Sequence, residues 1–392
     1  MSELVQKDWG SGIQRVVKSL MAHLLAHAPA GFHVEPVYAQ AGQEGYRYAR
    51  KFTLGFLGCP AEAFEDDPVD LRAGDIFLGL DLQPQRVPEQ AAFFARARNA
   101  GARVYFVVYD LLPVLLPQHF VAGASQGHEH WLDTVVRADG AICISRAVAD
   151  ELSAWMSQRP GLLASRGNRT FDIGWFHLGA DLPLKAQAGG APPTLPAEFT
   201  ALDQRMGTLP CFLMVGTIEP RKGYAQVLDA FELLWSRGSG ATLVIVGKPG
   251  WMVDALVSRL QAHAEAGKRL FWLPRADDEV LSVLYARCGA LIAASEGEGF
   301  GLPLVEAAHR GLRVIARDLP VFREVAGDSA TYFSGLSGQA LAAAIERWLA
   351  AAHEAAPNHT AAPATALTWA QSADQLARVV VQGGWQAQWP AP

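Results

Sequence analysis

Apolar residues along the first 180 positions follow two alternating spacings, one typical of strands and one typical of helices. Short apolar runs predict strands at residues 33–38, 75–80, 103–108, 141–145 and 171–178. Between them, apolar residues three and four positions apart predict helices at residues 88–99, 126–137 and 146–156. This alternation predicts a mostly parallel sheet flanked by helices. The glycine-rich residues 40–70 predict an irregular loop over one edge of the sheet.

A helix with a glycine-containing start is predicted near the beginning of the sequence. Gly10, Gly12 and Arg15 stand at this start, and apolar residues at helical spacing follow. A glycine loop that opens a helix normally follows a buried strand in a nucleotide-binding unit. Only residues 3–5 precede the loop as a short apolar stretch. We therefore expect a short or truncated first strand, and a chain cut from a longer polypeptide.

A change of composition divides the chain. Residues 183–209 are rich in proline and glycine, which predicts a linker. A second, more regular half follows, with predicted strands at residues 211–217, 241–247, 269–273, 290–294, 313–316 and 330–333. Its predicted helices lie at residues 224–236, 252–266, 277–286, 303–310, 321–326 and 338–351. The predicted domains are thus residues 1–182 and 210–367, followed by a terminal helix and tail at residues 368–392.

Composition narrows the class of protein. The 392 residues exceed one typical core and suffice for two. Half of them are hydrophobic, and the net charge of −6 argues against a general nucleic-acid binder. The four cysteines form no CxxC pair, which favours buried thiols over disulfides or a metal site. We expect no signal peptide and no membrane-spanning run, and hence a cytoplasmic protein, with peripheral contact at the inner face of the membrane left open.

A glycine-rich turn between two glutamates carries the strongest chemical signal. Glu298 opens the turn, and Glu306 lies in the first turns of the helix that leaves it. Glycines let a ligand approach the backbone, and a helix N-terminus favours phosphate. The carboxylates would repel phosphate and suit hydroxyl groups, so the turn predicts a sugar-nucleotide site. A general acid or base role for one glutamate is the alternative.

A second strand-to-helix turn carries two adjacent cations. Gly216 begins it, and Arg221 and Lys222 stand just before the next helix. Arginine can bind phosphate through two parallel hydrogen bonds, and lysine acts as a point charge, so this turn predicts a diphosphate site. The alternative is a solvated loop with surface charges. The complementary glutamates on the other turn weigh against that alternative.

Polar residues also follow two predicted strands of the first half. Tyr109 and Asp110 follow one strand, and Ser145 ends the next. Ligands gather at the carboxyl ends of parallel strands, so Asp110 is predicted to be functional, with a helix or turn cap as the alternative. For Ser145, the N-cap of the following helix carries at least equal weight. Surface or capping roles are predicted for the histidines His119, His128 and His130, while His177 is placed beside a strand end.

These motifs resemble those of retaining GT-B glycosyltransferases, specifically glycosyltransferase family 4. Residues 298–306 resemble its paired-glutamate motif, residues 216–223 its phosphate-binding turn and residues 10–15 its N-terminal glycine loop. Residues 109–113, 143–146 and 178–181 resemble segments of bacterial members that build surface polysaccharides. The resemblance implies two Rossmann-like domains that face each other across a cleft. It also implies a C-terminal helix that crosses back to the N-terminal domain.

The resemblance also implies roles for individual residues. Arg221 and Lys222 would bind the diphosphate, Glu306 the ribose, and Glu298 the donor sugar. The donor contacts would be completed by Gly216, Arg275, Gly299, Phe300, Gly301 and Leu302. The acceptor or phosphate side would be formed by Gly12, Arg15, Tyr109 and Ser145. Many family members have histidine where this sequence has Tyr109, which puts the usual role of that position in doubt.

The reaction implied by the resemblance is retaining transfer of a hexose, with mannose or rhamnose as the family-level expectation. The donor would be a GDP-, TDP- or UDP-linked sugar, and the acceptor a hydroxyl of a growing surface glycan or lipid-linked glycan such as an O-antigen. No metal and no cofactor are expected, because the cations and the helix dipole would stabilise the leaving diphosphate. Asp110 is the protein's alternative to the leaving phosphate as the base.

Two other functions remain open at this stage. A GT-B sugar-nucleotide epimerase or hydrolase would use the same donor pocket, but it would need a carboxylate and a histidine over the sugar carbon, and Tyr109 weakens that interpretation. A non-catalytic nucleotide-sugar-binding subunit, or a domain of a larger multidomain glycosyltransferase, would need the binding residues only.

Overall fold

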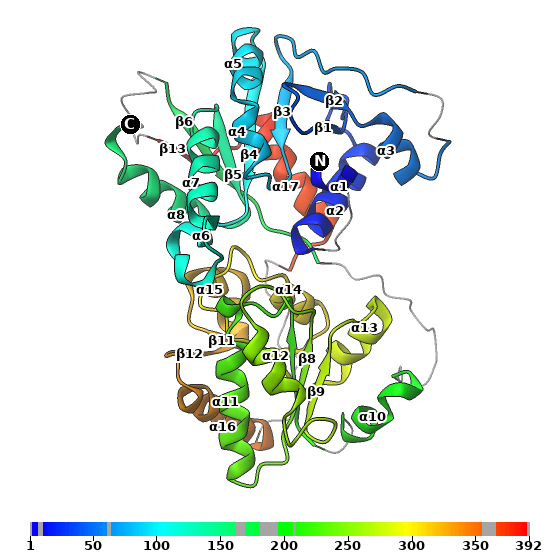
Figure 1. Cartoon of the computed structure of the whole chain (residues 1–392), viewed down its shortest axis with the longest axis vertical. Coiled ribbons are helices and arrows are strands. Elements are labelled where there is room, and N and C mark those ends of the chain that lie inside the picture. The colour runs from blue at the N-terminus through cyan, green and yellow to red at the C-terminus, as the bar shows by residue number, and fades with distance from the viewer. Residues whose placement is uncertain are drawn as a thin grey trace. The chain divides into compact units, whose positions relative to one another are not determined.

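The computed structural model describes residues 2–6, 11–60, 64–161, 169–180, 195–206, 209–354 and 366–389. The chain divides into two compact units, each built around its own sheet (Figure 1). Unit 1 comprises Met1–Leu115, Ala122–Leu178 and Thr368–Pro392, and unit 2 comprises Leu116–Val121 and Gly179–Leu367. The short segment Leu116–Val121 therefore belongs with the second half of the chain, although the sequence places it in the first.

Unit 1 contains a five-stranded sheet in the order β13-β6-β5-β4-β3. Its strands are β3 (Ile76–Gly79), β4 (Arg103–Val108), β5 (Gly140–Cys143), β6 (Phe171–Trp175) and β13 (Ala387–Trp389). The first four run parallel, as predicted, and β13 pairs antiparallel with β6. From Val104 to Val108, β4 is buried without alternation, which is typical of a strand covered on both faces. A separate antiparallel pair is formed by β1 (Val37–Ala39) and β2 (Tyr46–Tyr48).

The helices of unit 1 surround this sheet. They are α1 (Ser2–Gln6), α2 (Gly12–Ala26), α3 (Arg50–Phe56), α4 (Arg86–Glu89), α5 (Ala91–Asn99), α6 (Leu112–Leu115), α7 (Ala124–Val135), α8 (Arg146–Ser157) and α17 (Trp369–Gln382). The predicted terminal helix is α17, which begins with a capping box at Thr368 and packs against α2. Its Ser372 hydroxyl donates to the carbonyl of His177 at 2.7 Å. The C-terminal helix thus returns to the unit built mainly from the first half of the sequence.

Three predictions for the first half are wrong. Residues 3–5 lie in α1 rather than in a strand, and of the predicted strand at residues 33–38 only residues 37 and 38 lie in a strand, β1. Residues 40–70 include β2 and α3 instead of one irregular loop. Among the described residues, no neighbouring strand pairs with residues 33–36. A strand forms only where another backbone offers hydrogen bonds.

Unit 2 contains a six-stranded parallel sheet in the order β12-β11-β10-β7-β8-β9. Its strands are β7 (Cys211–Val215), β8 (Thr242–Val246), β9 (Leu270–Leu273), β10 (Ala290–Ala293), β11 (Arg313–Arg317) and β12 (Ala330–Phe333). Its α-helices are α10 (Thr200–Met206), α11 (Tyr224–Ser236), α12 (Asp254–Gln261), α13 (Asp278–Arg287), α14 (Leu302–His309), α15 (Pro320–Ala326) and α16 (Gly338–Glu354). Short 3₁₀ turns are η2 (Pro117–His119), η3 (Ala197–Phe199), η4 (Pro220–Lys222) and η5 (Gly327–Ser329).

Part of the predicted linker is folded. Residues 197–206 form η3 and α10, and the guanidinium of Arg287 pairs with Asp203 of α10. Arg205 of the same helix donates to the Thr242 hydroxyl at 3.0 Å. Residues 183–194, 207 and 208 lie outside the described residues. The predicted helix at residues 252–266 is shorter than expected, since α12 ends at Gln261.

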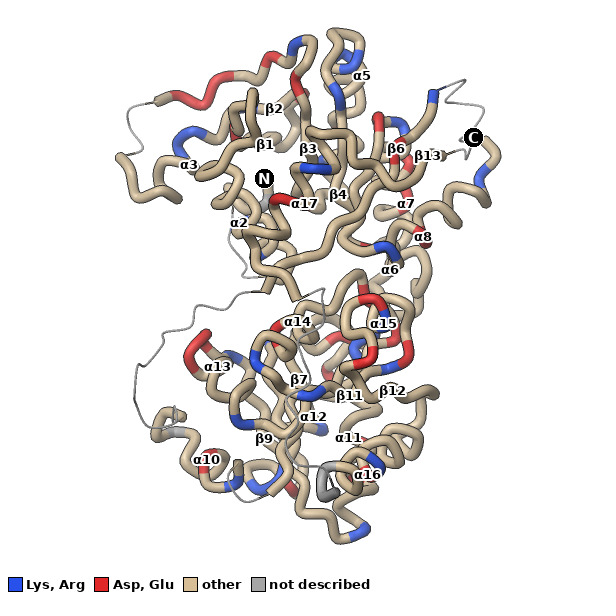
Figure 2. The backbone as a smooth tube through the Cα atoms, turned by 180° about the vertical axis from the view of Figure 1, so that it is seen from behind, with Lys and Arg blue, Asp and Glu red and all other residues tan. Residues whose placement is uncertain are grey.

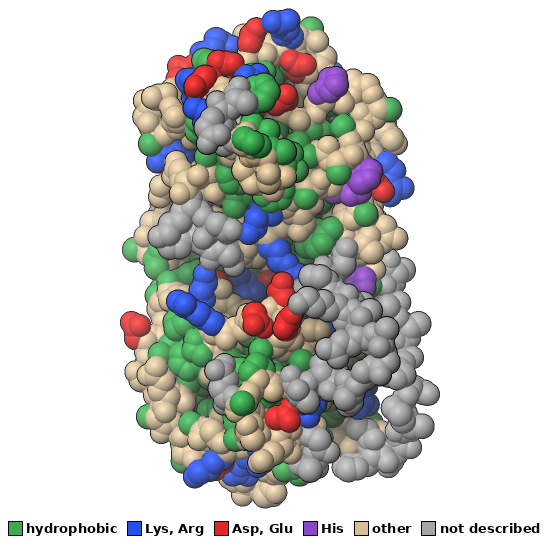
Figure 3. Space-filling model, turned by 90° about the vertical axis from the view of Figure 1, so that its right-hand side faces the viewer, with side chains coloured by type: hydrophobic (Ala, Val, Ile, Leu, Met, Phe, Trp, Pro, Cys, Tyr) green, Lys and Arg blue, Asp and Glu red, His purple; other side chains and the backbone are tan. Residues whose placement is uncertain are grey.

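Positive and negative side chains are mixed over the molecule. Lys and Arg are interspersed with Asp and Glu along both units (Figure 2), and both signs lie side by side on the face drawn in Figure 3.

The cysteines are free thiols, and Cys143, Cys211 and Cys288 are buried as predicted. The fold brings two of them together, because the sulfur atoms of Cys211 and Cys288 lie 3.5 Å apart. This contact and burial raise the pKa of the Cys288 thiol, which keeps it in the unreactive protonated form.

Candidate active site

The order of the strands in unit 2 marks where a ligand is expected. From β7 the chain moves to β8 and β9 on one side of the sheet, and then returns to β10, β11 and β12 on the other side. The connections that follow the adjacent strands β7 and β10 therefore lead to opposite edges of the sheet. In open parallel sheets, ligands bind beyond the carboxyl ends of the strands at such a switch point. The two motifs that the sequence singled out are these two loops.

The loop after β7 approaches the end of β10 closely. Gly223 has a φ of +73°, and a Cβ at this position would lie 2.3 Å from the carbonyl oxygen of Ala294. Only glycine satisfies both conditions. Gly216, at the start of the loop, has a φ of +138°, and its carbonyl accepts a 2.6 Å hydrogen bond from the Tyr224 hydroxyl. These glycines allow Arg221 and Lys222, which lie between them, to reach the other loop.

The two cations and Glu298 form one cluster of charges. Lys222 Nζ pairs with Glu298 Oε1, and Arg221 Nη1 lies 3.3 Å from Glu298 Oε2. Arg221 also pairs with Glu219 at 2.9 Å and donates to the carbonyl of Gly297 at 3.0 Å. The Ser295 hydroxyl donates to Glu298 at 2.8 Å. The sequence predicted these residues separately, and the structure joins them.

Glu298 is held in its ionised form. Burial alone would raise the pKa of the carboxyl group, but the charges of Lys222 and Arg221 outweigh burial. Hydrogen bonds from Lys222 and Ser295 act in the same direction, and together they lower the pKa of Glu298 to about 2. A carboxylate with this pKa accepts hydrogen bonds and is not suited to be a general acid near neutral pH.

The loop after β10 leads into α14 through a second constrained glycine. Gly301 has a φ of +93°, and a Cβ there would lie 2.8 Å from the ring of Phe322. Phe300 is buried beside it, and Leu302 is the first residue of the helix. Glu306, one turn into the helix, is 3% exposed, and it accepts a 2.6 Å hydrogen bond from the Tyr285 hydroxyl. The N-terminus of α14 and a fixed carboxylate thus lie on the same loop–helix unit.

Arg317 supports the loop after β10, and no sequence pattern predicted this role. Its guanidinium is buried below the end of β10, where it donates to the carbonyls of Ala294 and Ser295 at 2.8 and 2.9 Å. It also contacts the Gln226 side chain of α11 and the carbonyl of Gly335. Burial lowers the pKa of Arg317, although the nearby Glu296 favours the charged form. An arginine at the end of an apolar strand gives no local signal, because its partners are backbone carbonyls.

His119 also lies at this site, which the sequence did not predict. Its Nε2 atom lies 3.1 Å from Glu296 Oε2, two residues before Glu298. Trp251 holds the segment by donating its ring N–H to the carbonyl of His119 at 2.8 Å and by stacking on Phe120. The pairing joins residues 177 positions apart in the sequence. A lone histidine in a loop carries no signal for such a contact.

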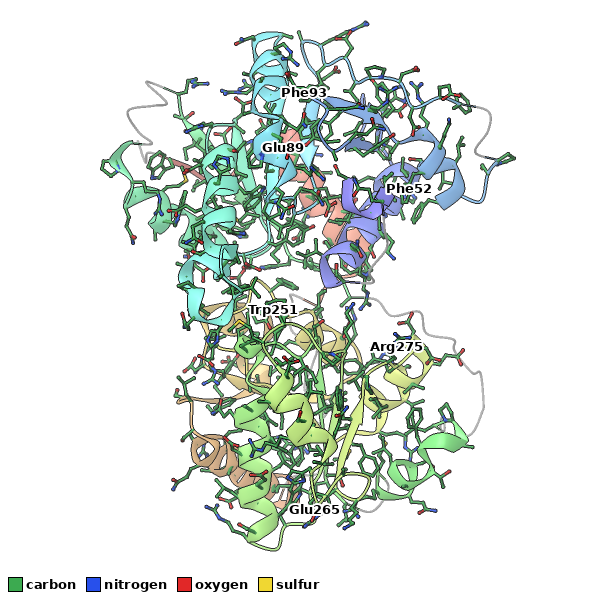
Figure 4. All side chains as sticks on the ribbon, in the orientation of Figure 1. Phe52, Glu89, Phe93, Trp251, Glu265 and Arg275 are labelled. Atoms are coloured by element: carbon green, nitrogen blue, oxygen red, sulfur yellow. The ribbon has the colours of Figure 1, made fainter. Side chains whose placement is uncertain are left out.

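Arg275 is not part of the charge cluster. It is exposed in the loop between β9 and α13, and Figure 4 labels it at that position. Because β9 is the edge strand and β8 separates it from β7, this loop lies away from the turn at Gly216. The predicted contact of Arg275 with the donor stays a prediction.

The predicted residues of the first half lie in unit 1 and have local partners there. Tyr109 is buried and donates its hydroxyl to the carbonyl of Leu80 at 2.8 Å. Asp110 accepts from the backbone N–H of Leu112 at 3.0 Å, which is the turn cap that the sequence left as an alternative. His128 lies 3.0 Å from the carbonyl of Asp110, and burial lowers the pKa of its imidazole.

The other predicted residues of this half lie at helix starts. Ser145 accepts from the N–H of Val148 at 3.2 Å and is the N-cap of α8. Gly12 is the first residue of α2 and is exposed, Arg15 is partly buried in the first turns of α2, and Gly10 lies outside the described residues. The start of α2 is stabilised by a capping box between Ser11 and Gln14.

Two further findings concern the described residues only. They contain no group of three or more His, Cys, Asp or Glu side chains that could hold a metal ion. None of their helices is long and apolar enough to cross a membrane.

The sequence of unit 2 matches a known family. Residues 204–361 match the family described as "Glycosyl transferases group 1". This confirms the family predicted from the paired glutamates and the two cations, which all lie within the matched residues.

Relatives of known sequence extend the similarity beyond this domain. The chain is 42% identical over 377 residues to the serotype-specific mannosyltransferase WbdA of Escherichia coli, which covers 96% of this chain and 44% of WbdA. The chain thus spans less than half the length of this relative. It is also 34% identical over 120 residues to the O-antigen chain mannosyltransferase B of Escherichia coli, which covers 30% of this chain and 31% of that protein.

Solved structures identify the fold. HepE of Anabaena, in complex with UDP and glucose, matches 95% of this chain and 93% of its own, with a TM-score of 0.57 and 17% identity. A UDP-forming trehalose-phosphate synthase of Burkholderia xenovorans matches 75% of this chain and 70% of its own, with a TM-score of 0.54 and 14% identity. Together with the two parallel sheets, these matches confirm the predicted GT-B fold.

Proposed function

We propose that the chain transfers a mannosyl group from a nucleotide-diphospho-sugar to a hydroxyl of a growing bacterial surface glycan, with retention and without a metal. The observation that carries this proposal is the cluster of Arg221, Lys222 and Glu298 at the switch point of the unit 2 sheet. Mannose is favoured over rhamnose because both WbdA and the O-antigen chain mannosyltransferase B are described as mannosyltransferases.

Binding of the donor begins with an exchange of partners. Glu298 is the anion that Lys222 and Arg221 contact in the structure. A diphosphate carries more negative charge than one carboxylate and offers more acceptor oxygens, so it takes over these contacts. Glu298 is then released to accept hydrogen bonds from hydroxyls of the sugar. While it is paired with these cations, its low pKa keeps it ionised and therefore an acceptor.

The ribose is assigned to Glu306. The Tyr285 hydroxyl fixes one of its oxygens at 2.6 Å, which orients the carboxylate. The N–H groups at the start of α14 favour the phosphate oxygens. The donor would therefore lie along the loop from Glu298 to α14.

The chemical step breaks the bond between the sugar C1 atom and the diphosphate oxygen, and forms a bond from C1 to the acceptor oxygen on the same face. Negative charge develops on the leaving β-phosphate, where Arg221 and Lys222 stabilise it. The proton of the acceptor hydroxyl passes to the leaving phosphate. Asp110 is the weaker candidate for the base, since it caps the turn at Leu112.

The setting of the reaction follows from the same proposal. The acceptor is a glycan or a lipid-linked glycan, which would place the protein in the cytoplasm at the inner face of the membrane. Because WbdA is longer than this chain, the proposal includes a second domain on the same polypeptide. Among the described residues, no feature favours a nucleic-acid partner.

A donor-and-acceptor assay tests the reaction. The full chain is incubated with GDP-, UDP- or TDP-linked mannose and a mannose-terminated oligosaccharide, and the anomeric configuration of the product is read by NMR. An α-linked product from an α-linked donor supports the proposal. Donor cleavage that needs no acceptor would favour the epimerase or hydrolase, and donor binding without product would favour the binding subunit. A flat thermal-shift response to GDP, UDP and TDP would contradict the donor site itself.

A matched pair of variants tests the site. Arg221→Lys keeps the positive charge but loses the bidentate contact with the diphosphate, so we expect kcat to fall about 10²–10³-fold. The control is Arg237→Lys, at an exposed pair with Glu346 in the same unit, and it should leave kcat unchanged. Equal rates for both variants would remove Arg221 from the diphosphate site.

A further inference from the structure

A histidine from the first half of the sequence contacts the loop that carries Glu298. The segment Leu116–Val121 belongs to unit 2, and His119 is the last residue of its turn η2. His119 Nε2 forms a 3.1 Å hydrogen bond with Oε2 of Glu296, in the loop after β10. Among the described residues, His119 is the only side chain that hydrogen-bonds to this carboxyl group. The two side chains are 14% and 26% exposed, so bulk water competes with this contact only in part.

His119 is itself held in place by the loop after β8. Trp251 of this loop, which Figure 4 labels, donates its ring N–H to the carbonyl of His119 at 2.8 Å. Its ring also stacks on Phe120, with 5.6 Å between the ring centroids. A directed hydrogen bond and a stacked ring together fix the orientation of the main chain at this point. The imidazole of His119 is therefore presented to Glu296 from a fixed backbone.

The loop after β8 is a rigid support, because its backbone is joined to the loop after β7. The N–H of Ile218 donates to the carbonyl of Lys248 at 2.9 Å, and the N–H of Gly250 donates to the carbonyl of Ile218 at 2.8 Å. A Cβ at Gly250 would lie 2.8 Å from that same carbonyl oxygen, so the two loops are in close contact there. His119 thus rests on the loop that carries the two cations.

The loop after β10 is held by two kinds of contact. The first kind consists of the contacts of Lys222 and Arg221 with Glu298. The second kind does not use the charges of these cations, since the N–H of Glu296 donates to the backbone carbonyl of Arg221 at 2.7 Å and the Glu296 side chain contacts His119. The exchange of partners proposed for donor binding would break the first kind of contact and leave the second kind intact.

We propose that His119 is a positioning residue of the donor site, which acts through Glu296 on the loop after β10 while a nucleoside diphosphate occupies the two cations. In the free protein, the cluster of charges around Glu298 already holds this loop. Once the diphosphate has taken over the cations, the contact with His119 keeps the loop in the same place. Glu298 then meets the sugar from a fixed backbone. This inference rests on the function proposed above, because it assumes that the cations bind a diphosphate.

The role as a positioning residue separates two quantities that can be measured. A nucleoside diphosphate without a sugar binds to the cations, so loss of the His119 side chain should leave its Kd and the melting temperature of the free protein nearly unchanged. The transfer reaction needs Glu298 in its correct place, and a misplacement of about 1 Å can cost about 10²-fold in rate. We therefore expect His119→Ala to lower kcat about tenfold, as a partial loss of this positioning.

A set of variants of the full chain tests this role. His119→Gln keeps an N–H donor close to the place of Nε2, so it should restore most of the kcat that His119→Ala loses. If His119 acts through Glu296, the double variant with Glu296→Ala should be no slower than Glu296→Ala alone. The matched control is His263→Ala, which removes a similar 3.0 Å contact with Glu232 elsewhere in unit 2 and should leave kcat unchanged.

Hydrogen exchange provides a measurement that does not depend on turnover. The probe is GDP, UDP or TDP, whichever raises the melting temperature of the wild type. Without nucleotide, the amides of residues 295–301 should exchange equally in the wild type and in His119→Ala. With saturating nucleotide, we expect them to exchange about tenfold faster in the variant.

Several results would overturn the role of His119. Equal exchange rates in the nucleotide-bound forms would do so, and so would faster exchange of the variant already without nucleotide, because the contact would then be structural only. A double variant slower than Glu296→Ala would show that His119 acts elsewhere. A wild type that binds none of the three nucleotides would overturn both proposals. A wild type that binds nucleotide without transferring a sugar would overturn the proposed function alone, and the exchange rates would still decide the role of His119.

Discussion

Glu298→Gln tests how much the charge cluster contributes to unit 2. Gln keeps the shape of the side chain and removes its charge, so Lys222 loses its anion and Arg221 retains only its pair with Glu219. Removing one partner of a buried ion pair leaves the charge of the other partner uncompensated, which is strongly destabilising. The Glu298 side chain is 11% exposed, so water screens the loss only in part.

The pKa of Glu298 gives the magnitude. It falls from 4.5, the value of an unperturbed carboxyl, to about 2 in the folded protein. The difference corresponds to about 3 kcal/mol of folding free energy. Because the folded-state pKa is the lower one, this contribution is fully present above pH 4.5. It is lost as the pH falls from 4.5 towards 2.

Urea denaturation of the wild type and the variant measures this contribution. At pH 7 we expect Glu298→Gln to lower the free energy of unfolding by about 3 kcal/mol, and at pH 3 we expect most of the difference to vanish. Glu346→Gln is the control, since its pair with Arg237 is exposed and should contribute no more than about 0.5 kcal/mol. A difference of the same size at both pH values, or none at pH 7, would refute the reasoning.

Three further changes have defined outcomes. Gly223→Ala should lower the melting temperature and abolish nucleotide binding in a thermal-shift assay, because its Cβ would lie 2.3 Å from the carbonyl oxygen of Ala294. Tyr285→Phe removes the hydroxyl that fixes Glu306, so it should cost about 1–3 kcal/mol in urea denaturation and raise KM for the donor more than it lowers kcat. Glu151→Gln should stabilise unit 1 at pH 8 and not at pH 4. Burial and the charges of two nearby aspartates raise the pKa of this carboxyl to about 7, so ionisation above that pH opposes folding.

Local patterns predicted most elements of the regular half well. The helix predicted at residues 224–236 is α11, with the same bounds, and the strand at residues 330–333 is β12. These segments combine one clear period with glycine or polar residues at their ends. The predictions failed at residues 33–36, where a strand needs a neighbour, and at residues 197–206, where contacts with Arg287 and Thr242 stabilise a helix in a proline-rich stretch.

The sequence by itself determined which chemical groups stand at the candidate site. Glycines, cations and carboxylates at two strand-to-helix turns are a local pattern, and they predicted a sugar-nucleotide site. Only the tertiary structure decided how these groups are paired. Because β7 and β10 are neighbouring strands, Glu298 contacts Lys222 and Arg221. His119 and Arg317 contact the same loop after β10, through Glu296 and the carbonyl of Ser295. Pairing depends on strand order and on contacts between distant residues, which a local pattern does not encode.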